Sequence, residues 1–196
     1  MCEKILLIDG HSILNRAFYG LPDLTNSEGL HTGAVYGFLN ILFKVLGEEK
    51  PEYLAVAFDR SEPTFRHAKY PEYKGTRKPM PQELKEQMPL LKEMLEKMGI
   101  ATVSLAGFEA DDILGTLAKN GEEKGLDVII LSGDRDLLQL ATKKTMIRLP
   151  RTAKGQTVIE DYKEDHAHRQ QKCEKTFFHR YSPFFGLSRS AAPRWD

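Results

Sequence analysis

Acidic side chains follow four short apolar stretches of this 196-residue sequence, and they are the residues best suited to do chemistry. Three of these stretches, KILLIDG, YLAVAFD and DVIILSGDRD, have continuous apolar runs that predict buried strands ending in acids. The fourth, ATVSLAG, leads directly into FEADDILG, which places three acids within four positions. The acids collected in this way are Asp9, Asp59, Glu109, Asp111, Asp112, Asp134 and Asp136.

Helical patterns separate these strands. Apolar residues recur at helical spacing, and acids open two shorter helices, as is favourable at a helix N-terminus. Strands that alternate with helices predict an α/β fold with a mostly parallel sheet flanked by helices. The carboxyl ends of its strands form the edge at which such sheets bind ligands. The predicted helices span 33–46, 81–98, 110–121 and 136–140, and a strand–turn–strand unit spans 145–161.

Several carboxylates at one sheet edge repel one another unless cations neutralise them. Sites built from oxygen ligands alone suit Mg²⁺ or Mn²⁺, and two such ions roughly 3.5–4 Å apart can clamp a phosphodiester. The alternative is structural, because a single Asp after a strand is most often a loop residue or a helix N-cap. Asp136 is a candidate cap for the DLLQL helix, and Asp112 a candidate partner of a helix dipole. Acids at four strand ends are harder to explain as caps.

Basic and aromatic residues alternate in FRHAKYPEYKGTRKPMP, residues 65–81. Lys and Arg bind phosphates, and aromatic rings stack on unpaired bases, so this segment is predicted to guide a polyanion to the acids. Lys74 and Arg77 are one helical turn apart and could face a scissile phosphate together. The alternative is a solvated loop whose tyrosines cover the edge of the core.

The composition restricts the class of protein. No apolar run approaches the ~18 residues that span a membrane, and the N-terminus has no signal-peptide pattern, so a cytoplasmic protein without membrane contact is expected. Two distant cysteines predict neither a disulfide framework nor a zinc site. The net charge of zero divides into 22 basic and 26 acidic residues over 1–165, and six basic against two acidic residues over 166–196. A phosphate-binding surface on the body must therefore be local or completed by metal ions.

Taken together, five segments resemble the 5′-nuclease (5′–3′ exonuclease) domain of bacterial DNA polymerase I, within the flap endonuclease superfamily. They occur in the order typical of that family between about residues 4 and 162. The segments are LLIDGHSILNRAFYG, TGAVYGFLN, AVAFDRSEPTFRHAKYPEYKGTRKPMP, GFEADDILGTLA and LSGDRDLLQL.

The resemblance implies a resolvase-like (PIN-like) fold with a basic helical arch, and a monomer in the bacterial cytoplasm. It implies Mg²⁺- or Mn²⁺-dependent hydrolysis of DNA in replication and repair, as a 5′–3′ exonuclease or 5′-flap endonuclease. The substrate would be a 5′ flap or a single-strand/duplex junction, with RNA primers as a further candidate. The seven acids match the family's metal ligands, and Lys74 and Arg77 match its catalytic cations. The expected DNA-binding residues are Arg16, Phe18, Arg66, Tyr73, Lys74, Arg77 and Lys78.

The resemblance ends near residues 163–165. The family continues into a Gly-Asp-x-Ser-Asp-Asn segment and a duplex-gripping helix–hairpin–helix module, neither of which is seen in 163–196. We therefore expect an incomplete nuclease domain at 1–165 and an irregular tail at 166–196, read from a shifted frame. The two-metal site would be incomplete and cleavage weak or absent. The alternatives are a natural short paralogue, a non-catalytic metal- or DNA-binding fragment, and a PIN-type ribonuclease.

Overall fold

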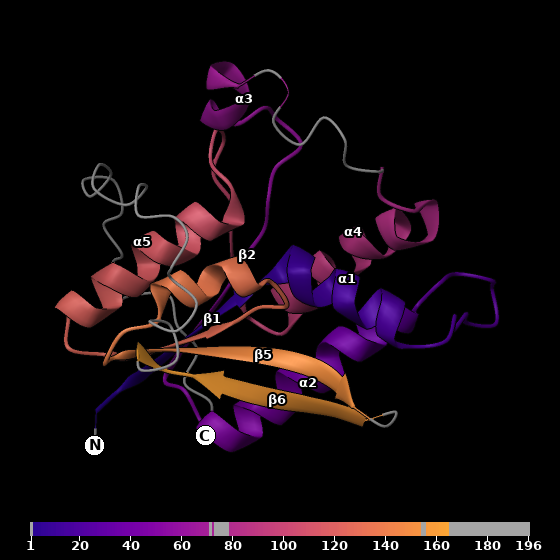
Figure 1. Cartoon of the computed structure of the whole chain (residues 1–196). Coiled ribbons are helices and arrows are strands. Elements are labelled where there is room, and N and C mark those ends of the chain that lie inside the picture. Colours follow the sequence, from indigo (N-terminus) through magenta and orange to yellow (C-terminus); the bar gives the residue numbers. More distant parts are fainter. Residues whose placement is uncertain (1, 71, 73–78, 154–155, 165–196) are drawn as a thin grey trace.

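A six-stranded sheet with helices on both faces forms the part of the chain that the computed structural model describes, residues 2–70, 72, 79–153 and 156–164 (Figure 1). The strand order is β3-β2-β1-β4-β5-β6, and every neighbouring pair is parallel except β5–β6. This arrangement confirms the predicted fold class. The strands are β1 (Lys4–Asp9), β2 (Tyr53–Ala57), β3 (Ala101–Val103), β4 (Asp127–Leu131), β5 (Thr145–Ala153) and β6 (Gln156–Tyr162).

Five α-helices and one 3₁₀ turn accompany the described strands. None of the described helices is long and apolar enough to cross a membrane. The helices are α1 (Gly10–Gly20), α2 (Gly33–Glu49), α3 (Phe65–Lys69), α4 (Gln82–Lys97) and α5 (Ala110–Glu123), and the 3₁₀ turn is η1 (Arg135–Leu140).

Helix α1 is absent from the sequence-based prediction. It begins at the residue after β1, without an intervening loop, because Asp9 ends the strand and also caps the helix. The Asp9 carboxylate accepts the backbone N–H of Ser12 at 3.0 Å, which satisfies one of the free N–H groups of the first helical turn. The apolar residues Ile13, Leu14 and Ala17 then face the core at helical spacing.

Strand β1 divides its side chains between two apolar cores. Leu6 and Ile8 pack into the cluster that α1, α2 and α4 cover, whereas Ile5 and Leu7 pack into the cluster that α5 covers. Because both faces of the sheet are buried, the strand is apolar throughout rather than alternating. Each such side chain stabilises the fold by roughly 1.5–3 kcal/mol when fully buried.

The chain reverses its direction of travel across the sheet at β1. It moves from β1 outward to β2 and β3, and then returns to place β4 on the other side of β1. In open parallel sheets, the carboxyl ends of strands at such a switch point leave a crevice for ligands. This edge of the sheet is where the predicted acids lie.

The outer strands and α2 are joined by one buried guanidinium. Arg148 of β5 donates from Nε to Asp161 of β6 at 2.8 Å. Its two remaining nitrogens donate to Glu48 at 2.8 Å and Glu49 at 2.9 Å, both at the end of α2. We refer to these four residues as the Arg148 cluster.

Candidate active site

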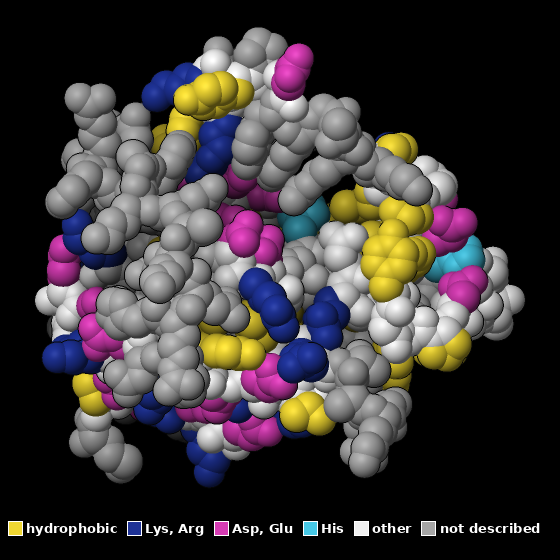
Figure 2. All heavy atoms as spheres, viewed as in Figure 1, with side chains coloured by type: hydrophobic (Ala, Val, Ile, Leu, Met, Phe, Trp, Pro, Cys, Tyr) yellow, Lys and Arg dark blue, Asp and Glu magenta, His cyan; other side chains and the backbone are white. Residues whose placement is uncertain are grey.

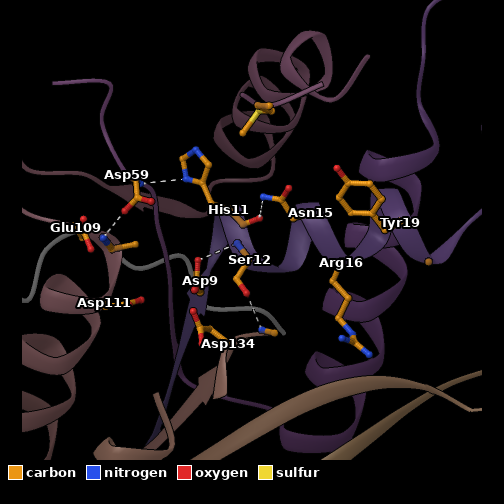
Figure 3. A pocket seen from close by; sticks show the side chains of 14 residues that line it. Asp9, His11, Ser12, Asn15, Arg16, Tyr19, Asp59, Glu109, Asp111 and Asp134 are labelled. Atoms are coloured by element: carbon orange, nitrogen blue, oxygen red, sulfur yellow. Dashed lines mark hydrogen bonds between the residues drawn. The ribbon is translucent and has the colours of Figure 1, made fainter. Parts of the chain in front are cut away.

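A cavity of about 660 Å³ opens at the carboxyl ends of β1, β2 and β4, between the starts of α1 and α5 (Figure 3). Five of the seven predicted acids line it. They are contributed by strand ends and helix starts that are as many as 125 positions apart in the sequence (residues 9 and 134). We call this set the acidic cavity, and its carboxylates are Asp9, Asp59, Glu109, Asp111 and Asp134.

Asp9 is the most buried of these five acids, with 5% of its surface exposed. The hydroxyl of Ser132, the residue after β4, donates to its second carboxylate oxygen at 2.9 Å. Burial raises the pKa of Asp9 to about 6, and the negative charges of Asp59 and Asp134 add to this effect. The hydrogen bonds from Ser12 and Ser132 act in the opposite direction, because they stabilise the charged form.

Asp111 is the most strongly perturbed acid of the cavity. Burial raises its pKa to about 7, and the charges of Asp9, Asp134, Asp59 and Glu109 raise it further in that order. A carboxylate that is both buried and surrounded by like charges is a strong candidate for a functional group. A bound cation would relieve both effects at once, since it would replace the lost solvation and offset the repulsion.

Asp59 and Asp134 are each held by backbone hydrogen bonds. One oxygen of Asp59 accepts the N–H of Ala110 at the start of α5, at 2.6 Å. Asp134 caps η1 by accepting the N–H of Asp136 at 2.9 Å. The cap of this turn is therefore Asp134, and the suggestion that Asp136 caps it is wrong, because the helical turn begins one residue earlier than predicted.

Asp112 and Asp136 are not among the residues that line the cavity. Asp112 instead forms a two-pronged ion pair with Arg66 of α3, at 2.6 and 2.7 Å, and also accepts the backbone N–H of Glu109 at 3.1 Å. Asp136 is exposed to solvent. The Arg66 guanidinium thereby ties α3 to the start of α5, and its predicted role in DNA binding stays a prediction.

The donor set of the cavity suits a hard divalent cation, because carboxylate oxygens are its only charged ligands. Over the described ranges, no three His, Cys, Asp or Glu side chains are grouped closely enough to hold one metal ion. Mg²⁺ is commonly bound through only one or two carboxylates, with water and substrate phosphate completing its shell. The residues therefore fit such an ion, although they do not form a closed protein cage.

One face of α1 also lines the cavity, and the sequence-based prediction included only Arg16 from it. Ser12, Asn15, Arg16 and Tyr19 recur three or four positions apart, so they lie on the same side of the helix. His11 lines the cavity as well. This spacing was the signal that could have identified them, but it is visible only once 10–20 is recognised as a helix.

Of the predicted DNA-binding residues that the structure describes, Arg66 pairs with Asp112, and the other two lie in different places. Arg16 lines the cavity, whereas Phe18 packs against the core on the α2 side of the sheet. Figure 2 shows acidic side chains near the middle of this face, with Lys and Arg side chains gathered beside them. Tyr73, Lys74, Arg77 and Lys78 lie outside the described residues, so their roles stay predictions.

Comparison with known proteins adds a separate line of evidence. Residues 4–175 match the family model described as 5′-3′ exonuclease, N-terminal resolvase-like domain. DNA polymerase I of Bacillus subtilis is 50% identical over 164 residues, which are 84% of this chain and 18% of that protein. DNA polymerase I of Bacillus caldotenax is 50% identical over 162 residues, which are 83% of this chain and 18% of that protein. The chain thus spans less than a fifth of the length of these relatives.

A structure of T5 5′-exonuclease with bound zinc ions is similar in fold. It superposes with a TM-score of 0.58 at 24% identity, covering 74% of this chain and 54% of that one. The family match extends past residue 165, where the resemblance seen in the sequence ended. The predicted boundary and the irregular tail stay predictions, because 165–196 lie outside the described residues.

Proposed function

Because the chain belongs to the family of 5′–3′ exonuclease N-terminal resolvase-like domains, we propose that its acidic cavity hydrolyses DNA phosphodiesters near a 5′ flap or a single-strand/duplex junction. The observation that carries this proposal is the convergence of five carboxylates in one cavity, two of which have their pKa raised toward neutrality. Glu109 has an ion pair with Arg66 at 3.7 Å, whereas Asp9, Asp59, Asp111 and Asp134 have none in the described part of the chain. A purely structural cluster would be expected to have such pairs.

Divalent cations are the cofactor that this cavity fits best. When bound, they would lower the pKa of water and offset negative charge on the phosphate. The structures of T5 5′-exonuclease and of bacteriophage T5 flap endonuclease contain metal ions, the latter together with DNA. We propose Mg²⁺ or Mn²⁺ for this chain, each ion held by one or two of the carboxylates of Asp9, Asp59, Glu109, Asp111 and Asp134, with water and substrate phosphate completing its shell.

Residues of α1 are suited to the nucleic-acid side of the reaction. Arg16 provides a positive charge at the cavity wall, where it can hold a phosphate. Tyr19 lines the same wall and is 71% exposed, so its ring is available to stack on an unpaired base. Lys74 and Arg77 remain the proposed catalytic cations, and Tyr73 and Lys78 remain proposed DNA-binding residues.

A fluorescent 5′-flap substrate tests the proposal. Cleavage by the purified chain that requires Mg²⁺, stops with EDTA and is lost in Asp111→Asn would support it. Cation or DNA binding without turnover would favour a non-catalytic module, and preference for RNA would favour a PIN-type ribonuclease. The expectation of weak cleavage is tested in the same assay against DNA polymerase I of Bacillus subtilis. A monomeric state, a bacterial cytoplasmic location and action on RNA primers stay predictions.

A further inference from the structure

His11 contacts the loop that carries Asp59, although it is not one of the predicted site residues. We propose that His11 is a positioning residue, which fixes the Asp59 carboxylate in the acidic cavity through the backbone of Asp59. This inference rests on the proposed function, because it concerns how a cation-binding acid is held. It gives a specific role to one of the α1 residues that line the cavity.

The pairing of β1 with β2 brings the two residues together. Asp9 lies opposite Ala57 in this parallel pair, so the next residues, Gly10 and Phe58, are also neighbours. A Cβ atom on Gly10 would lie 2.3 Å from Cε1 of the Phe58 ring, so the ring occupies the space that a side chain would fill. The buried Phe58 ring then meets the His11 ring edge to face, with 5.6 Å between ring centroids.

The contact between the Phe58 and His11 rings places His11 within hydrogen-bonding distance of the Asp59 backbone. The backbone N–H of Asp59 donates to Nδ1 of His11 at 3.1 Å (Figure 3). Nδ1 can accept only when it carries no proton, so the neutral ring is the tautomer protonated at Nε2. The carboxylate of Asp59 meanwhile accepts the N–H of Ala110 at 2.6 Å. Asp59 is therefore held at its backbone by α1 and at its side chain by α5.

These two bonds matter because the local chain has no regular structure to hold it. Residues 58–64 form neither helix nor strand. The Phe58 N–H donates to the Val103 carbonyl of β3 at 2.9 Å, and at the next residue the N–H of Asp59 donates to His11 instead of to a strand. A partner that orients a metal-binding side chain typically contributes a factor of roughly 10–100 in metal affinity. The competing explanation is that His11 only fills space beside Phe58.

Two substitutions separate these explanations. His11→Asn keeps an acceptor, because the Asn side-chain oxygen reaches the position of Nδ1, whereas His11→Phe keeps the ring and removes the acceptor. Mn²⁺ binding to the whole chain, measured by electron paramagnetic resonance, should weaken about tenfold in His11→Phe and stay close to the unaltered value in His11→Asn. His31→Asn is the matched control, since His31 pairs with Asp23 and does not line the cavity.

Equal Mn²⁺ affinity in His11→Phe and the unaltered chain would overturn the proposal, as would equal weakening in both His11 variants. Hydrogen exchange of the Asp59 amide provides a second readout that needs no metal. We expect slow exchange in the unaltered chain and in His11→Asn, and fast exchange in His11→Phe. If the unaltered chain binds no Mn²⁺, the proposed cofactor is wrong, and exchange alone decides the role of His11. Fast exchange of this amide in the unaltered chain overturns that role even if a variant fails to fold.

Discussion

The Arg148 cluster and the acidic cavity are two groups of charges with opposite designs. Arg148 is 6% exposed and donates to three carboxylates, which together satisfy its guanidinium. In the cavity, Asp9, Asp59, Asp111 and Asp134 have no ion pair with any Lys, Arg or His of the described chain. Carboxylates that share a cation of the fold support its structure, whereas carboxylates without one indicate a charged ligand.

The comparison predicts its largest stability effect at Arg148. We expect Arg148→Met to lower the free energy of unfolding by about 2–3 kcal/mol, because it removes the charged hydrogen bond to the part-buried Glu49 together with those to the exposed Glu48 and Asp161. Urea denaturation followed by circular dichroism measures the change. Arg151→Met is the control on the same strand, since its exposed pair with Glu160 should contribute at most about 1 kcal/mol. Similar losses in the two variants would contradict the distinction drawn here.

In the acidic cavity, removal of a charge should stabilise the metal-free chain rather than destabilise it. Asp111→Asn should raise the free energy of unfolding of the metal-free chain by about 1–3 kcal/mol, because it removes a buried charge surrounded by like charges. The same substitution should abolish flap cleavage and reduce the stabilisation that Mg²⁺ gives. Thermal unfolding with and without Mg²⁺ measures both effects. A destabilised metal-free variant would mean that Asp111 is a structural acid.

The pH dependence of stability follows from the direction of the pKa shifts. In the folded chain Asp9 has a pKa of about 6 and Asp111 a pKa of about 7, both above the ordinary value of 3.8. Between these values the folded chain therefore binds more protons than the unfolded chain. The stability that they contribute is complete below pH 4 and is lost as the pH rises to 7, by at most about 1.4 kcal/mol per pH unit and group. We expect a higher melting temperature at pH 5 than at pH 7 without metal.

Two controls assign this pH effect to the cavity. An Asp9→Asn, Asp111→Asn double variant should show a flatter profile, and saturating Mg²⁺ should remove most of the loss at pH 7. His31 must be separated from these acids, because its hydrogen bond to Asp23 raises its pKa and gives a contribution of the same sign. A profile that His31→Asn flattens, and the double variant does not, would place the effect outside the cavity.

Of the substitutions predicted to alter stability, Ser132→Ala should have the smallest effect. The Ser132 hydroxyl donates to Asp9 at 2.9 Å and accepts the N–H of Asp134 at 3.0 Å, so it links two acids of the cavity. Ser132→Ala should cost about 1 kcal/mol of stability and raise the pKa of Asp9 above about 6, since it removes a bond that favours the carboxylate. Carboxylate NMR titration measures this pKa. An unchanged pKa of Asp9 would show that Ser132 contributes to packing but not to the charge state of Asp9.

The sheet could be predicted from the sequence because buried parallel strands leave continuous apolar runs such as Ile5 to Ile8. Helix α1 could not, because it follows β1 without a loop and Asp9 belongs to both elements. The sequence also could not show that Asp111 lines the cavity whereas the adjacent Asp112 does not. Adjacent residues on a helix point about 100° apart, and which of them faces the cavity depends on Arg66, which is 46 positions from Asp112.

The bond from Ser132 to Asp9 joins residues 123 positions apart, and this separation has a consequence for folding. The acidic cavity cannot form until β4 has joined β1, a non-local pairing that requires closure of a long loop. A nascent chain therefore contains Asp9, Asp59 and Asp111 well before it can assemble them. The cavity is thus assembled only after the first four strands of the sheet and residues 132–134 have been synthesised.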